Sequence, residues 1–121
     1  MRIPISTAAG LCLLLAPSYA ADAEAARLAT HRFKDAYWNC LAQEAVKALP
    51  RKMAGSDFVI FIKGRCLDEV KQFRIALVDY LAIKHPDVQM PTHLMAADQT
   101  IQAALADISS TYVDLKTKDG R

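Results

Sequence analysis

Apolar side chains recur at steps of three and four along three stretches of this chain, and prolines separate the stretches. Such spacing places the apolar residues on one face of an α-helix, because a helix has about 3.6 residues per turn. The first stretch covers residues 22–49 and is followed by Pro50, and the second covers residues 57–84 and stops before Pro86. The third begins with Thr92 as a helix cap. The pattern predicts an all-α fold, a three-helix up-down-up bundle with the middle helix at its centre.

The stretch at residues 57–84 is apolar on two sides. Its main stripe comprises Val59, Ile62, Cys66, Val70, Phe73, Leu77 and Tyr80, and a weaker second stripe comprises Ile60, Ile75, Val78 and Ala82. A helix that is apolar on two faces usually contacts two neighbours, which is why we place it at the centre. The alternative is a strand over residues 58–62, where β-branched residues favour extended structure. No other stretch offers a partner strand, so the helix is the favoured interpretation.

The first 20 residues have the features of a secretory signal peptide. Arg2 is their only charge, an apolar core extends to Ala16, and Ser18 and Ala20 put small residues at the two positions that a signal peptidase reads. The apolar core is about half as long as the ~20 residues that a bilayer span requires. We therefore expect cleavage after Ala20 and a single helical domain at residues 21–121. We expect this domain in the periplasm or secreted, without stable membrane anchoring.

Cleavage changes the cysteine count from three to two, because Cys12 leaves with the signal peptide. Exported proteins fold where thiols are oxidised. Cys40 lies nine residues before Leu49 and Cys66 lies nine residues after Asp57, so both lie about 14 Å from the turn between the first two helices. We predict a Cys40–Cys66 disulfide that staples these helices into an antiparallel hairpin. Catalytic dithiols usually form a Cys-x-x-Cys motif, and the wide separation here favours a structural role over a redox one.

Two carboxylates flank the predicted disulfide. Glu44 lies one helical turn after Cys40, and Glu69 lies three residues after Cys66. Such a pair would suit acid–base chemistry. In the predicted hairpin, however, the two side chains lie on opposite sides of the bridge, about 10 Å apart along the bundle. We therefore expect partly exposed carboxylates that pair with nearby Lys or Arg.

Histidines offer a weak alternative site. His85 and His93 flank the loop at residues 86–91, with Asp87 nearby, so a zinc or copper site there is conceivable. Neither histidine has a second ligand three or four residues away, and solvated loop histidines are the favoured interpretation. We expect no metal and no cofactor.

Trp38 and the second apolar stripe define a candidate partner surface. Tyr37 belongs to the core stripe of the first helix, whereas Trp38 points about 100° away from it. Trp38 either packs on the third helix or lies exposed. An exposed Trp38 together with Ile60, Ile75 and Val78 would mark a surface for a partner or a second copy.

The net charge of the chain and the motifs that it lacks argue against several classes of function. The chain has 15 Lys and Arg against 13 Asp and Glu, which gives a formal net charge of +2. This charge is too small to indicate a nucleic-acid partner. It contains no glycine-rich phosphate loop and no nucleophile with a recognisable base, so we expect that the protein has no enzymatic activity. We expect a non-catalytic exported protein that acts by contact with a protein partner or as a homodimer. The alternatives are an acid-activated periplasmic stress chaperone and a metal or small-ligand binder at residues 85–93.

Overall fold

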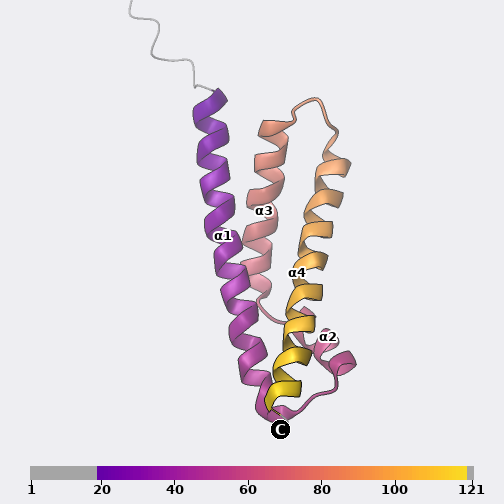
Figure 1. Cartoon of the computed structure of the whole chain (residues 1–121). Helices are drawn as coiled ribbons and strands as arrows, with labels where there is room; N and C mark the ends of the chain where they lie inside the picture. Colours follow the sequence, from indigo (N-terminus) through magenta and orange to yellow (C-terminus); the bar gives the residue numbers. More distant parts are fainter. Residues whose placement is uncertain (1–18, 120–121) are drawn as a thin grey trace, which may run out of the picture.

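The computed structural model describes residues 19–119, and this part of the chain is helical without any strand. Its elements are α1 (Tyr19–Ala48), the 3-10 turn η2 (Leu49–Arg51), α2 (Gly55–Lys63), α3 (Leu67–Lys84) and α4 (Met90–Asp119) (Figure 1). The all-α prediction is confirmed. The alternative strand at residues 58–62 is wrong, since these residues lie in α2. None of the described helices is long and apolar enough to cross a membrane.

The predicted signal peptide lies almost entirely outside the described residues. Tyr19 and Ala20, its last two residues, form the start of α1. The Tyr19 hydroxyl donates a hydrogen bond to the carbonyl of Ile83 near the end of α3. Cleavage after Ala20 stays a prediction, and it would remove this contact between α1 and α3.

The single helix predicted at residues 57–84 is wrong, because two helices occupy this stretch. α2 ends at Lys63 and α3 begins at Leu67. Between them, Cys66 has a φ of 57°, a left-handed conformation that interrupts a helix. Gly64 favours the break because glycine has a low helix propensity. The apolar spacing continues across the break, and it therefore gave no sign that the helix axis changes.

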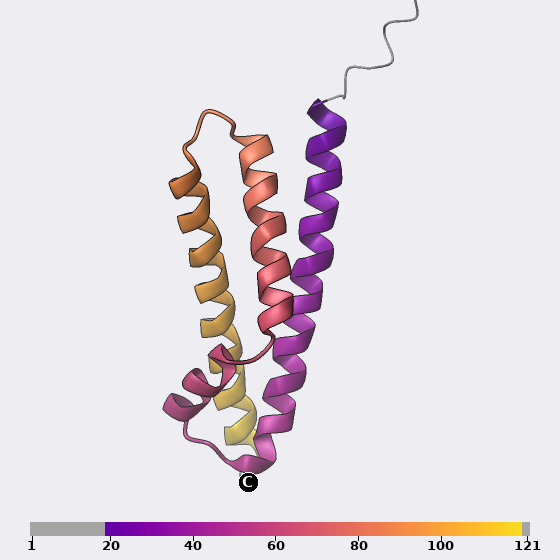
Figure 2. The same ribbon diagram turned by 180° about the vertical axis from the view of Figure 1, so that it is seen from behind.

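The break allows α2 to pack apart from α3. α1 packs along α3, α3 packs along α4, and α2 packs against the C-terminal half of α4 (Figures 1 and 2). α1 and α4 run in one direction and α3 runs in the other. The end of α4 contacts η2, at the opposite end of the molecule from the loop that joins α3 to α4.

Aromatic side chains form much of the core. Tyr37 of α1 stacks on Phe73 of α3 with ring centroids 6.2 Å apart, and Phe58 of α2 stacks on Tyr112 of α4 with centroids 4.0 Å apart. All four rings are buried. The Tyr112 hydroxyl donates a hydrogen bond of 3.0 Å to the carbonyl of Met53, which satisfies its polar end. The short helix α2 thus closes the core against α4 through Phe58.

The start of α4 also differs from the prediction. The helix begins at Met90 rather than after Thr92, and it takes Pro91 into its first turn, where no intrahelical N–H is needed. His93 in this turn is only 4% exposed, and its Nε2 donates a hydrogen bond of 3.1 Å to the carbonyl of His85. This bond ties the loop after α3 to the first turn of α4.

Candidate functional site

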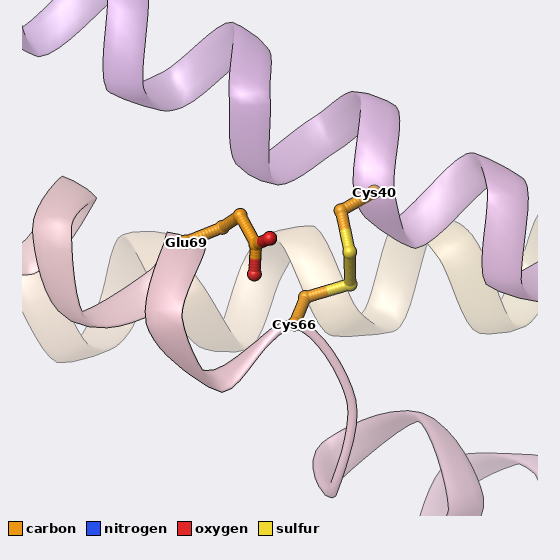
Figure 3. Close-up of side chains that lie close together, drawn as sticks. All are labelled: Cys40, Cys66 and Glu69. Atoms are coloured by element: carbon orange, nitrogen blue, oxygen red, sulfur yellow. A yellow bond between two sulfur atoms is a disulfide. The ribbon is translucent and has the colours of Figure 1, made fainter.

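The Cys40–Cys66 disulfide joins α1 to the turn in front of α3 (Figure 3). Its Sγ atoms lie 2.02 Å apart and its Cα atoms 6.0 Å apart, so the predicted pairing is confirmed. The predicted register is wrong, because Cys66 is the N-cap of α3 and not a residue in the middle of a helix. The pairing holds because Cys40 faces α3, and the connection from α2 enters α3 beside it.

The carboxylate of Glu69 lies next to the disulfide. Glu69 stands in the first turn of α3, three residues after Cys66, and its carboxylate points toward the two sulfur atoms (Figure 3). A carboxylate oxygen and the two Sγ atoms all lie within 4.8 Å of one another, and the three residues are half-buried. The i, i+3 spacing on α3 explains the approach, since residues three apart share a helix face.

Glu44 reaches the same place from α1. It lines a surface cavity of about 450 Å³ together with Cys40, Arg65, Cys66, Asp68 and Glu69. Its carboxylate lies 3.8 Å from the Nε of Arg65 and 3.8 Å from the Nζ of Lys47, so its expected pairing with basic residues is confirmed. Glu44 pairs with Arg65, which precedes Cys66, whereas Glu69 follows Cys66 on α3, as expected for carboxylates on opposite sides of the bridge. Both carboxylates nevertheless line one cavity.

Arg65 connects this cavity to α2. Its guanidinium lies 4.6 Å from the ring centroid of Phe61, and the guanidinium of Arg51 lies 5.5 Å from the same centroid. Cations above an aromatic face are attracted by its negative potential. The disulfide, the carboxylates of α1 and α3 and the side chain of Arg65 thus line one cavity, which we call the disulfide cavity.

A second cavity, the α1–α3 groove, lies between these two helices and has a volume of about 350 Å³. Its apolar lining comprises Ala26, Ala29 and Phe33 of α1 with Ile75, Ala76 and Ile83 of α3. Gln72 and Asp79 are its polar members. Ile75 is 54% exposed, and it lies next to the other apolar residues of the lining. The groove is therefore an apolar surface open to solvent.

The structure does not bring the predicted partner-surface residues together. Trp38 is half-buried and lies edge-on to the rings of Tyr37 and Phe73, with centroids 5.4 and 5.5 Å away. Ile60 is 74% exposed but lies on α2. Val78 is half-buried on α3, and of the predicted set only Ile75 lines the α1–α3 groove.

Sequence reasoning missed the α1 side of the groove. Ala26, Ala29 and Phe33 follow one another at steps of three and four, the same spacing that identified the other stripes. Alanine is also a strong helix former, so its presence there does not by itself indicate a lining role. The spacing was a usable signal, but only the packing of α1 beside α3 shows that this stripe is left partly open.

The histidines do not converge on a metal site in the described part of the chain. The Nε2 atom of His93 is already bonded to the carbonyl of His85. Across residues 19–119, the group of three potential ligands that lies close enough together is Cys40, Cys66 and Glu69. Sequence reasoning paired the two cysteines and placed Glu69 near them, but it did not consider the three residues as a metal site.

An exposed ion pair joins α3 to α4. The Nε of Arg74 lies 2.9 Å from the Oδ1 of Asp98. The hydrogen bond from Arg74 lowers the pKa of the Asp98 carboxyl below its ordinary value of 3.8, and the same bond raises the pKa of Arg74. Protonation of Asp98 in acid would therefore remove a contact between these helices.

No protein-family model matches this chain, and no curated protein and no solved structure matches it either.

Proposed function

We propose that this chain is a small exported helical protein that performs no catalysis and acts by binding a protein partner in the α1–α3 groove. The observation that carries the proposal is the apolar lining of the groove, with Ile75 at 54% exposure. Removing such surface from water is the main driving force of protein association, and exposed apolar clusters often mark contact sites.

The groove fits a helix of the partner. Two packed helices leave a furrow between them, and the side chains of a third helix fill such a furrow when they recur at steps of three and four. Asp79 gives the groove a negative charge at its edge. We therefore propose an amphipathic helix with a Lys or Arg opposite Asp79 as the occupant.

The location and the architecture belong to the same proposal. The signal-peptide features of residues 1–20 support export, and the Cys40–Cys66 disulfide fits it, because disulfides persist in oxidising compartments such as the periplasm. We assign α1, α3 and α4 to a three-helix bundle that presents the groove. In this arrangement α2 is an added helix that covers the end of α4.

Site-specific photo-cross-linking in the native cell tests the proposal. In one variant a benzophenone amino acid replaces Ile75 in the groove. In the matched control it replaces Ile60, an exposed apolar residue on α2. We expect one discrete adduct from position 75 and none from position 60. An adduct of twice the mass of the chain would assign the groove to a second copy instead. No adduct at position 75, or the same adducts from both positions, would contradict groove binding.

A second candidate function, the acid-activated stress chaperone, is favoured by the Arg74–Asp98 pair between α3 and α4. Loss of this pair in acid loosens the contact between two helices whose facing sides are apolar. We expect the protein to suppress aggregation of a denatured client at a pH well below 3.8, the ordinary pKa of aspartate, and not at neutral pH. Equal suppression at both pH values, or none at either, would reject this candidate.

A further inference from the structure

The disulfide cavity holds three side chains that are zinc ligands once the disulfide is reduced. We propose that reduction of Cys40–Cys66 creates a site for a thiophilic divalent cation, with Zn²⁺ as the expected ion. Its ligands are the Sγ atoms of Cys40 and Cys66 and a carboxylate oxygen of Glu69. The site and the disulfide are mutually exclusive, because each uses both sulfur atoms.

The ligand spacing supports this assignment. Zn–S bonds measure about 2.3 Å and Zn–O bonds about 2.0–2.2 Å, so two ligands of one tetrahedral ion lie roughly 3.5–4 Å apart. The three donor atoms here already lie within 4.8 Å of one another. Opening the disulfide lets the two sulfur atoms move apart to the distance that the ion requires. Small side-chain rotations then complete the site, without movement of α1 relative to α3.

The elements that supply the ligands are already in place. Cys40 comes from α1, whereas Cys66 and Glu69 come from the N-cap and the first turn of α3. The i, i+3 spacing of the latter two puts both ligands on one face of α3, directed at Cys40 (Figure 3). All three residues are half-buried, so an ion can reach them and still be partly shielded from water.

The charges around the site favour the metal-binding form. A thiolate and not a thiol binds zinc, and a helix N-terminus stabilises a thiolate. Cys66 occupies that position on the 18-residue helix α3. Glu44 lines the same cavity but is paired with Arg65 and Lys47, which leaves the carboxylate of Glu69 as the one that points at the sulfur atoms.

The chemistry balances with a dithiol as the reductant. The dithiol gives two electrons and two protons to the Sγ–Sγ bond, which breaks to yield two cysteine thiols, and the reductant leaves as a cyclic disulfide. Zn²⁺ then displaces one proton from each thiol. The two Zn–S bonds replace the S–S bond as the connection between α1 and α3, so the reduced protein keeps this connection when metal is present.

Metal titration of the reduced protein tests the proposal. The protein is reduced with a dithiol, freed of reductant without oxygen, and titrated with Co²⁺ and then with Zn²⁺ in competition with a chromophoric chelator. We expect sulfur-to-cobalt charge-transfer absorption, one Zn²⁺ per chain and a submicromolar dissociation constant. The oxidised protein should show none of these. Absence of the charge-transfer band in the reduced protein would overturn the site.

Two matched variants separate a built site from binding by two free thiols. Glu69→Gln should weaken Zn²⁺ binding at least ~10-fold, the scale on which groups that support a metal site act. Asp68→Asn is the control, because Asp68 lines the same cavity but is not among the three ligands. It should leave the affinity unchanged. Equal affinities for the two variants would overturn the assignment of Glu69.

Discussion

Removal of the disulfide should destabilise the metal-free protein by about 3.5 kcal/mol. The perturbation is the double substitution Cys40→Ala/Cys66→Ala, which opens a covalent loop with a sequence separation of 26. In the chain-entropy relation, the bridge lowers the entropy of the unfolded chain by roughly 12 cal/mol/K, which gives this free energy at room temperature. Because a domain typically has only ~5–15 kcal/mol of net stability, the loss removes a large share of it.

Urea unfolding measures this loss with two probes. Far-UV circular dichroism follows the helices, and the fluorescence of Trp38 follows the packing of its ring against Tyr37 and Phe73. The two transitions should coincide if unfolding is two-state. Wild-type protein reduced in metal-free buffer is the control, and it should lose the same free energy without any substitution. A loss below about 1 kcal/mol in both samples would refute the reasoning that the bridge stabilises by constraining the unfolded chain.

Three further outcomes are expected. Phe58→Ala should cost about 3–5 kcal/mol in urea unfolding because the ring is fully buried against Tyr112, whereas Ile60→Ala on the exposed side of α2 should cost almost nothing. Equal costs would contradict the placement of α2. Since Arg74 lowers the folded-state pKa of Asp98 below 3.8, the stability from this pair is present above pH 3.8 and is lost as the pH falls through the lowered pKa. Asp98→Asn should therefore flatten the pH dependence of the urea midpoint in this acidic range, and an unchanged profile would contradict the role of the pair. Intact-mass analysis of the protein recovered from the exporting cell should show a chain that begins at Ala21, and a retained N-terminus would contradict export by signal cleavage.

The fold class and the disulfide could be predicted because both follow from patterns that are visible in the sequence. Helical spacing shows wherever a helix buries one face, as it does at Phe73 and Tyr112. If the predicted signal peptide is cleaved, Cys40 and Cys66 have only each other as partners. No comparable pattern indicates the break at Cys66. Its apolar spacing is continuous, and the signal of Gly64 alone is weak, because single glycines also occur inside helices.

The two candidate sites could be predicted only in part. Glu69 follows Cys66 by three residues, and this spacing places the two residues on one helix face whether or not the helix breaks at Cys66. The spacing alone does not show that the Glu69 carboxylate comes within 4.8 Å of both sulfur atoms, and the structure shows that it does. The α1–α3 groove could not be predicted from the sequence for a different reason. Ile75 lies opposite an alanine-rich face of α1, and the space left by small side chains follows from how two helices pack and not from the spacing on either one.

Photo-cross-linking from position 75 in a charge-reversed groove tests the central claim, that the α1–α3 groove receives a helix of a partner, most directly. Asp79→Lys places a like charge opposite the basic residue proposed for the partner, and like charges at an interface disfavour binding. The matched control is Asp57→Lys, which makes the same charge change on α2, away from the groove. We predict that the adduct falls at least ~10-fold in Asp79→Lys and is retained in Asp57→Lys. Adducts of equal yield in the two variants would contradict the claim.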